Sequence, residues 1–413
     1  HFLYRKLERD MLNLPKKLRI KVPSESDMTH FFLTIENIIT NVYIFCRLSL
    51  VESIPEGHMY PPNMTHLPTK NVWLDLIDEA QSTIEIASFY WNLRYNEDYP
   101  HNSSIEGEQV FQALYAAGSK RKIEIKIAQN WPSKQFPNLD TEYLLKKKSA
   151  QVRSLNFSKW FGSGILHTKF WIIDRKHFYI GSANMDWRSL TQVALICYSL
   201  FIISIYLYYI ILNCMLLYLQ SSPPPLSPVG RTNDDVAIVN IINSAEEFVY
   251  ISVMDYEPII MLIFRFWPNI DNALRRVALE NKIKVKLLIS WWKHSAPAED
   301  HFLRSLTDLS DAYPRVDIQV KRFIVPSTPD QDKIPYARVN HNKYMVTDRT
   351  AYIGTSNWSG DYFTTTAGVA FVFEEHIGHD GSFQNLTTNI RKDLQGVFER
   401  DWNSPYAVPL RQL

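Results

Sequence analysis

Two stretches of this chain carry the same reactive side chains in the same order. Each has a histidine, a lysine two positions later and an aspartate five positions after the lysine: His167, Lys169, Asp174 and His341, Lys343, Asp348. Imidazole can attack phosphorus when it is neutral and can donate a proton when it is charged, and lysine brings positive charge to phosphate oxygens. The doubled pattern makes these six residues the candidate catalytic set and predicts a phosphodiesterase with one phosphoryl-transfer site assembled from both copies.

Both motifs lie among apolar, β-branched and aromatic residues, which indicates β-strands. Side chains alternate between the two faces of a strand, so His167 and Lys169 share one face while Asp174 projects from the other. We therefore expect the histidines and lysines to contact substrate and the aspartates to anchor the strands. By symmetry, either histidine could attack phosphorus.

A turn of the form Gly-Ser/Thr-x-Asn follows each motif, at residues 181–184 and 354–357. The amides of Asn184 and Asn357 are predicted to bind the substrate phosphate. A single histidine on a strand is more often packed or exposed than catalytic, but the doubled spacing with a matched turn favours a functional site. Trp187 and Arg188, just after the first turn, could line the cleft or only pack.

The remaining signals for chemistry are weak. Four further histidines lack such a context and are predicted to be surface residues: His58, His66, His294 and His301. The three cysteines, Cys46, Cys197 and Cys214, give no disulfide framework, and no tightly spaced cluster of metal ligands occurs, so neither a metal nor a cofactor is expected. The sequons at Asn63, Asn102 and Asn385 are candidate glycosylation sites.

The composition excludes a strongly basic surface, because 44 lysine and arginine residues oppose 43 aspartate and glutamate residues. Any polynucleotide must then be bound by a local groove. At 413 residues the chain can bury a large core. Residues 1–45 show neither a signal-peptide pattern nor an uninterrupted apolar span, and we interpret them as a separate N-terminal segment.

The order of predicted elements is repeated along the chain. In residues 46–193, helix 74–80, strand 83–90, helix 107–117, strand 122–128 and helix 143–149 precede the first motif. In residues 231–413, helix 241–245, strand 248–253, helix 270–279, strand 282–289, helix 302–309 and strand 316–325 precede the second. Alternating strands and helices indicate an α/β fold with parallel or mixed sheets covered by helices, built by internal duplication.

Residues 194–230 interrupt this regularity. The stretch 194–219 is uncharged and long enough to cross a membrane, and a proline-rich linker follows it. Three interpretations compete: a buried helix or pair of strands, a membrane span, or a stretch from a mis-joined exon that replaced normal coding sequence. A membrane span would separate the two motifs and prevent a shared site.

The two motifs, together with residues 181–193 and 338–359, resemble the phospholipase D superfamily, and within it the branch of lysosomal 5′ exonucleases. The resemblance covers about residues 46–193 and 223–413. It implies a pseudo-dimer of two α/β sandwich halves with one active site at their interface, and a phosphohistidine intermediate.

The resemblance also implies a substrate and a location. It favours 5′-to-3′ degradation of single-stranded DNA or RNA in an acidic lysosomal lumen, with phospholipid transphosphatidylation as the alternative. Relatives of this kind are type II proteins of the endoplasmic reticulum membrane, so membrane association would require an N-terminal anchor that is missing or altered here. A homodimer is a further possibility.

One departure from the branch affects the site. A glutamate that supports an active-site histidine in the branch corresponds to Leu195 here, and residues up to 221 do not match. The cysteines that would pair with the one near Cys46 fall in the same stretch. We therefore expect weaker control of the histidine tautomer and, as a further alternative, an inactive product whose first half is disrupted by residues 194–220.

Overall fold

The computed structural model describes residues 46–94, 101–202, 216–374 and 384–410. It separates into a short unit, His1–Arg47, and a compact unit, Leu48–Leu413, and the compact unit contains both motifs. Within the described ranges, none of the helices is both long and apolar enough to cross a bilayer. The proposed glycosylation residue Asn385 has a side chain outside the described part.

The first half is built on a mixed sheet with the strand order β2-β1-β10-β8-β7-β3-β5-β6. Its strands are β1 (Cys46–Ser53), β2 (Leu67–Pro68), β3 (Thr83–Ser88), β5 (Glu124–Asn130), β6 (Gln151–Leu155), β7 (Lys169–Ile173), β8 (His177–Gly181) and β10 (Val193–Ile202). Its helices are α3 (Thr69–Glu79), α4 (Ile105–Ser119), α5 (Leu139–Lys146), α6 (Phe157–Phe161) and α7 (Arg188–Thr191).

The second half has a sheet with the order β11-β22-β20-β19-β12-β16-β17-β23. Its strands are β11 (Leu216–Ser222), β12 (Phe248–Val253), β16 (Lys284–Ser290), β17 (Ile318–Phe323), β19 (Lys343–Thr347), β20 (Thr350–Gly354), β22 (Gly368–Glu374) and β23 (Ala407–Pro409). Its helices are α9 (Asp234–Ser244), α10 (Asn269–Glu280), α11 (Glu299–Ala312), α12 (Gly360–Thr364) and α13 (Gln384–Trp402).

Short elements complete both halves. Two-residue strands form small pairs: β4 (Trp91–Asn92) with β9 (Met185–Asp186), β13 (Tyr256–Glu257) with β21 (Trp358–Ser359), and β14 (Ile259–Ile260) with β15 (Arg265–Phe266). The strand β18 (Val339–Asn340) leaves the second half and pairs with β10 of the first. Single 3₁₀ turns lie at Pro62–Met64, Asn102–Ser104, Pro224–Leu226, Met261–Ile263 and Gln331–Lys333.

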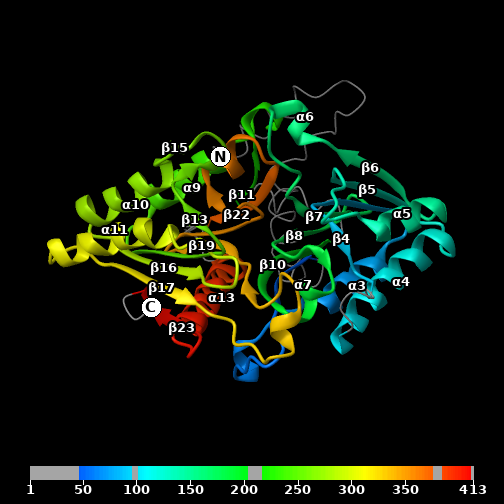
Figure 1. Ribbon diagram of the computed structural model, residues 1–413, viewed down its shortest axis with the longest axis horizontal. Coiled ribbons are helices and arrows are strands. Elements are labelled where there is room, and N and C mark those ends of the chain that lie inside the picture. Colours follow the sequence, from blue (N-terminus) through cyan, green and yellow to red (C-terminus); the bar gives the residue numbers. More distant parts are fainter. Residues whose placement is uncertain (1–45, 95–100, 203–215, 375–383, 411–413) are drawn as a thin grey trace, which may run out of the picture. The chain divides into compact units, whose positions relative to one another are not determined.

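The two sheets correspond strand by strand, which confirms the predicted duplication. In the first, β3 pairs parallel with β5 and antiparallel with β7; in the second, β12 pairs parallel with β16 and antiparallel with β19. Figure 1 shows α3, α4 and α5 beside the first sheet and α9, α10 and α11 beside the second. The sheets meet through aromatic side chains, since the Phe371 ring of β22 lies 5.4 Å from Phe178 of β8 and 5.8 Å from Tyr198 of β10.

Each half has its own apolar core. In the first, Trp73 of α3 stacks on Trp171 of β7 with ring centroids 5.2 Å apart, and both side chains are buried. In the second, buried residues of α9 and α10 cover the matching face of β12. Full burial of such a side chain contributes about 1.5–3 kcal/mol, so these cores hold the motif strands firmly in place.

The outer faces of the two sheets differ. Helix α13 packs on the second sheet, where the Phe398 ring stacks on Tyr250 of β12 at 4.8 Å, and every residue of β19 is buried. In the first half β7 alternates between buried and partly exposed residues. With helix α13 in place, both faces of β19 are therefore buried, whereas one face of β7 stays partly exposed to solvent.

The apolar stretch after residue 193 forms strands at both of its ends. β10 pairs antiparallel with β8 in the first sheet, and β11 pairs antiparallel with β22 in the second. The predicted division at 193 and 231 is therefore wrong in the structure, because β10 completes the first half and β11 begins the second, as β1 begins the first. The described ends agree with the hypothesis of a buried pair of strands; residues 203–215 lie outside the described part.

Candidate active site

The two histidine segments are held by the opposite halves. The backbone N–H of His167 donates to the carbonyl oxygen of Ala367 at 2.9 Å, and the N–H of His341 donates to that of Ala194 at 2.9 Å. The second contact comes from β10, the stretch that the sequence made suspect. Both histidines are thereby placed at the interface between the halves, as the resemblance implied.

A glycine permits the close approach on the first side. Gly164 has φ +87°, and a Cβ atom there would lie 2.2 Å from the carbonyl oxygen of Thr365 in the second half. Any larger residue would both strain the backbone and push the halves apart. The loop that leads into His167 therefore depends on this position.

The imidazole rings also reach across the interface. His167 Nδ1 lies 2.7 Å from the carbonyl oxygen of Thr355, and His341 Nδ1 lies 3.0 Å from that of Ser182. A carbonyl oxygen can only accept, so Nδ1 must carry the proton in both rings. Nε2 is then left with its lone pair in each neutral histidine, which is the atom needed for attack on phosphorus.

These contacts correct the prediction about tautomer control. Leu195, the residue at the position of the missing glutamate, is 1% exposed and packs in the first core. The backbone carbonyl oxygens of Thr355 and Ser182 instead fix the tautomers of both histidines. The prediction of a disrupted first half is likewise wrong for the described strands.

The two lysines are buried behind their histidines. Lys169 Nζ donates to the carbonyl oxygen of His167 at 2.8 Å, and Lys343 Nζ donates to that of His341 at 2.8 Å. Both are 1% exposed. The expectation of direct substrate contact therefore changes: in the described structure the ammonium groups brace the histidine backbone and act on the site through their charge.

Burial dominates the electrostatics of the site. It lowers the pKa of His167 and of His341 well below the ordinary value, and the nearby lysines lower both further. Burial also lowers the pKa of Lys169 well below its ordinary value, with Lys343 adding to the effect. The pKa of Lys343 falls to about 7 through burial, although Asp255 opposes the shift. Both histidines are therefore neutral at neutral pH.

The two histidines open onto a common cavity of about 320 Å³. Residues of both halves line it: Phe89, Tyr90, Phe136, His167, Asn184, Asp186, Arg188, Ser189, Val193, Met254, Trp292, His294, Tyr336, Val339, His341, Asn357 and Tyr362. The site thus brings together the histidines and asparagines predicted from the sequence. Within the described ranges, no group of His, Cys, Asp or Glu residues lies close enough to hold a metal ion.

The two asparagines have different neighbours. Asn357 Nδ2 donates to Asp255 Oδ2 at 2.6 Å and to the Tyr362 hydroxyl at 3.3 Å. Asn184 Nδ2 lies 3.5 Å from the Tyr90 hydroxyl, which itself donates to a carboxylate 2.8 Å away. The second half therefore places a partly exposed carboxylate where the first has a phenol, and desolvation raises the pKa of Asp255.

The motif aspartates lie away from the cavity. Asp174 accepts hydrogen bonds from the backbone N–H groups of Gln81, Ser82 and Thr83 at 2.7–2.8 Å. Asp348 caps the equivalent turn at residues 246–248, with distances of 3.0–3.5 Å. Their inclusion in the catalytic set is therefore wrong in the structure, and their part is to anchor the strands, as the alternation of the strand faces predicted.

Several residues take different places from those the sequence suggested. His58 is buried with its ring stacked on Tyr406 at 4.0 Å, so its prediction as a surface residue is wrong, whereas His294 is exposed, as predicted, and also lines the cavity. Trp187 is buried, whereas Arg188 lines the cavity and pairs with Asp186.

Two of the predicted glycosylation residues can be located. Asn63 and Asn102 lie on the surface, where sugar attachment is sterically possible. Their modification stays a prediction.

Sequence motifs did not identify two residues that contact Asn357: Tyr362, which lines the cavity, and Asp255. The repeat register offered a signal for Asp255, because Ile84 and Ile86 match Val249 and Ile251, and the same register pairs Tyr90 with Asp255. The aromatic residues from distant loops, Phe136 and Tyr336, give no such signal.

Comparison with known proteins agrees with this geometry. The family model described as "PLD3/4, PLD-like domain" matches residues 62–218 and 214–328. The 5′-3′ exonuclease PLD3 of Xenopus laevis is 45% identical over 412 residues, which cover 89% of this chain and 82% of that protein. The human 5′-3′ exonuclease PLD3 is 42% identical, with 88% and 81% covered.

A solved structure shares the fold. The phosphatidylserine synthase of Haemophilus influenzae Rd KW20 superposes with a TM-score of 0.56 over 83% of this chain and 86% of that chain, at 11% identity. Such a low identity speaks for the fold alone. Together with the two histidines that share one cavity across a duplicated interface, these matches identify the chain as a member of the PLD3/4 family of PLD-like proteins.

Proposed function

We propose that this chain is a phosphodiesterase that removes nucleotides from the 5′ end of single-stranded DNA or RNA through a phosphohistidine intermediate. The observation that carries the proposal is the pair of neutral histidines, His167 and His341, which present unprotonated Nε2 atoms to one cavity. The relatives named as 5′-3′ exonucleases support the choice of substrate.

The first chemical step joins one histidine to phosphorus. Its Nε2 attacks the phosphodiester, a P–N bond forms, and the P–O bond to the leaving nucleotide breaks. The leaving oxygen needs a proton, which the second histidine supplies in its imidazolium form. A bound phosphodiester anion raises the pKa values of nearby histidines and lysines, so the substrate itself promotes protonation of that second ring.

The second step restores the enzyme. The second histidine, now neutral, takes a proton from a water molecule as the water oxygen attacks phosphorus, and the P–N bond breaks. The buried charges of Lys169 and Lys343 stabilise the negative charge that develops on phosphate oxygens in both steps. The preset tautomers remove the need to reorient either ring between the steps.

The lowered histidine pKa values favour an acidic medium, because a proton donor becomes more available as the pH falls towards them. We therefore place the activity in an acidic lumen such as that of the lysosome. A type II anchor in the endoplasmic reticulum membrane and a homodimer remain parts of the proposal that call for separate measurement.

A 5′-labelled oligonucleotide assay at acidic pH tests the proposal. The chain should release the label as a mononucleotide in the first cleavage and then shorten the strand stepwise, and a circular oligonucleotide without a 5′ end should resist cleavage. His341→Ala should abolish release, while the exposed His301→Ala serves as the matched control. Full activity of His341→Ala would refute the mechanism, and preferential turnover of phosphatidylglycerol vesicles in a competition assay would favour the phospholipid alternative.

A further inference from the structure

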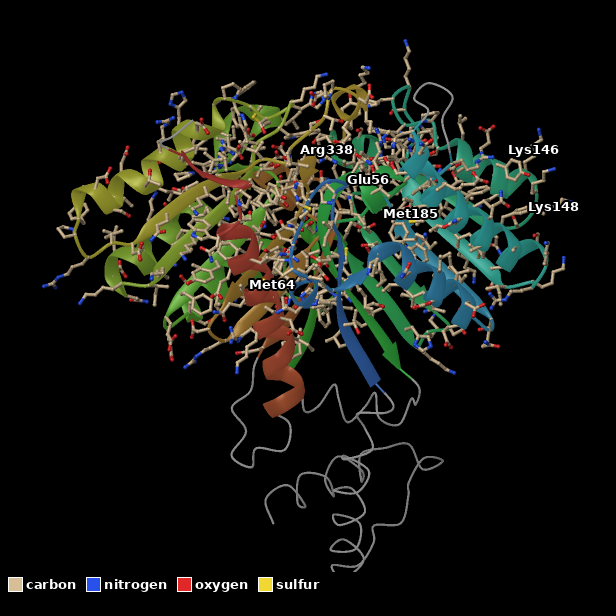
Figure 2. All side chains as sticks on the ribbon, turned by 90° about the horizontal axis from the view of Figure 1, so that it is seen from below. Glu56, Met64, Lys146, Lys148, Met185 and Arg338 are labelled. Atoms are coloured by element: carbon tan, nitrogen blue, oxygen red, sulfur yellow. The ribbon has the colours of Figure 1, made fainter. Side chains whose placement is uncertain are left out.

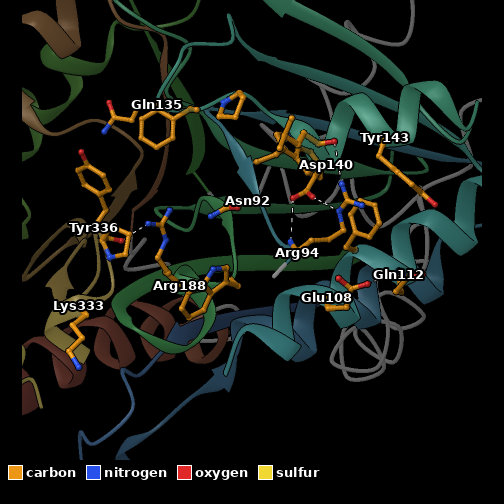
Figure 3. A pocket seen from close by; sticks show the side chains of 17 residues that line it. Asn92, Arg94, Glu108, Gln112, Gln135, Asp140, Tyr143, Arg188, Lys333 and Tyr336 are labelled. Atoms are coloured by element: carbon orange, nitrogen blue, oxygen red, sulfur yellow. Dashed lines mark hydrogen bonds and ion pairs between the residues drawn. The ribbon is translucent and has the colours of Figure 1, made fainter. Parts of the chain in front are cut away.

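A second and larger cavity adjoins the reaction cavity. Its volume is about 920 Å³, and it shares three lining residues with the site: Phe136, Arg188 and Tyr336. Figure 3 shows Arg188 and Tyr336 at one end of this cavity and Arg94, Asp140 and Tyr143 at the other. The shared residues lie between the two cavities and line both of them.

The lining of the larger cavity is polar and aromatic. Amide side chains come from Asn92, Gln112 and Gln135, and the cation Lys333 lies near the Tyr336 end. Such a surface offers hydrogen bonds and charges to a polar ligand. Gln112 Nε2 donates to Glu108 Oε1 at 2.6 Å and Lys333 Nζ donates to Asp330 Oδ1 at 2.8 Å, and an acyl chain would cover these polar groups without adding a hydrogen bond to any of them. The chemistry therefore favours nucleotides over lipid tails.

The far end of the cavity carries a fixed cation. Arg94 Nε pairs with Asp140 Oδ1 at 2.6 Å, and its guanidinium lies 4.5 Å from the ring of Phe111 and 4.7 Å from that of Tyr143. Asp140 also accepts from the backbone N–H of Leu93 at 2.6 Å. These contacts hold a flat, charged and aromatic surface in place, which suits phosphates and bases.

Tyr336 lines both cavities and has a strained backbone conformation. It is 43% exposed, its backbone φ is +55°, and its ring lies nearly parallel to that of His294 with centroids 5.0 Å apart. A bulky residue in this conformation costs about 1–3 kcal/mol, which the surrounding structure must offset. Arg188 contributes to this support by donating a hydrogen bond to the carbonyl oxygen of Pro335. The Tyr336 ring, stacked on His294 by one face, is thereby held between the two cavities.

We propose that the larger cavity binds the nucleotides that follow the scissile phosphate of a single strand, with Tyr336 stacking on the first of their bases. This inference rests on the proposed exonuclease function. Stacking is tolerant of sequence because every base has an aromatic face. The site would then bind the retained strand without base selection, while the reaction cavity holds the terminal nucleotide.

Two substrates separate the subsite from the chemistry. Thymidine 3′-methylphosphate has the terminal nucleotide and one phosphodiester but no following base, whereas a thymidine decanucleotide has both. Tyr336→Ala should raise KM for the decanucleotide about tenfold more than KM for the small diester, the effect of losing one base stack. Tyr336→Phe keeps the ring and should behave like the unmodified chain.

Two more variants complete the design. Gln112→Trp, on the exposed side of α4, would obstruct the larger cavity and should weaken decanucleotide binding alone. Tyr313→Ala removes another exposed tyrosine, which lines neither cavity, and should change nothing. Circular dichroism and melting temperatures confirm that each variant is folded.

The outcomes are distinct. An equal loss on both substrates, or no loss on either, would overturn the subsite. Inhibition of small-diester cleavage by short-chain phosphatidylglycerol that Gln112→Trp relieves would overturn the assignment to nucleotides. An unmodified chain that cleaves neither substrate would refute the proposed function itself, and the subsite with it.

Discussion

The strands β7 and β19 share the residues that position their histidines but differ in the groups around them. β7 and β19 each carry a lysine that braces its own histidine and are each followed by an aspartate that caps a turn. Behind Asn184 stands the Tyr90 phenol, whereas behind Asn357 stands the Asp255 carboxylate. Both halves thus keep the lysine and the aspartate that position the histidine strand. They differ in the group beside the asparagine, which affects the charge of the site, so the two histidines can perform unequal roles.

Replacing each histidine in turn is the most severe test of this inequality. His167→Ala and His341→Ala should each lower the rate of oligonucleotide cleavage by about a thousandfold or more, because each removes one required proton-transfer or nucleophilic group. If the roles are unequal, mass spectrometry after acid-free quenching should find phosphate on only one histidine. Phosphate on both histidines in equal amounts would contradict the comparison.

The second largest effect on activity is expected from replacing the carboxylate of Asp255. Asp255 opposes the lowering of the Lys343 pKa, so Asp255→Asn should let the lysine lose its proton at a lower pH. Activity that needs this charge should fall about tenfold at neutral pH, equivalent to about 1.4 kcal/mol, and the alkaline limb of the pH–rate profile should move to lower pH. Tyr90→Phe should leave that limb in place, and an unmoved limb in both variants would argue against the role of Asp255.

The two caps differ in quality. Asp174 makes shorter hydrogen bonds than Asp348, so Asp174→Ala should lower the free energy of unfolding by about 2 kcal/mol and Asp348→Ala by about 1 kcal/mol. Urea titration measures both, and the activity of the folded fraction should persist. A larger loss for Asp348→Ala would reverse the ranking.

The cap of the first half should also respond to acid. Partial burial raises the pKa of Asp174, but hydrogen bonds from Thr83, Gln81 and Ser82 outweigh it and lower the pKa below the ordinary value. The stability that this carboxylate adds is therefore present above its ordinary pKa and is lost as the pH falls through the lowered pKa.

The smallest effect concerns a buried histidine that packs against residues of the second half. Burial, with Arg338 and Arg400, lowers the pKa of His58 to about 3. The unfolded chain takes up a proton near the ordinary value and the folded chain does not, so the free energy of unfolding falls as the pH drops below that value. His58→Phe should reduce this fall by about 1 kcal/mol between about pH 7 and about pH 5.5.

The matched control for that measurement is the exposed His301→Phe, which should leave the pH dependence unchanged. The melting temperature of each variant at several pH values provides the comparison. An unchanged acid dependence in His58→Phe would show that other groups, including the two site histidines, account for it.

Local patterns predicted much of the fold, because alternating strands and duplicated spacing are properties of neighbouring residues. The strand predicted at 122–128 begins at Glu124 in the structure, since Lys122 has φ +62° and cannot continue it. The stretch 194–219 was ambiguous because a long apolar run suits a membrane helix and a pair of strands equally well. Only the pairing of β10 and β11 with different sheets separates these possibilities.

The site was predictable where it is repeated and unpredictable where it is not. The spacing of the duplicated motif identifies His167 and His341. Tyr336 and His294 also line the cavity, but they lie in loops whose sequence shows no repeat. The loop of Tyr336 is held by long-range contacts of Arg338, which donates to the backbone of Glu56 at 3.0 Å and to Gln192 at 3.2 Å. Figure 2 shows Glu56 and Arg338 near one another, although they are far apart in sequence.

In each half, the histidine Nδ1 donates to a backbone carbonyl oxygen of the other half, and this limits how the protein can evolve. A carbonyl belongs to the backbone, so no substitution at Thr355 or Ser182 deletes it. Only a shift of the whole turn could withdraw it, and that turn belongs to the other copy. Neither copy supplies the carbonyl oxygen that fixes the tautomer of its own histidine, so an ancestor with one copy would have needed a second molecule of the same chain to complete the site.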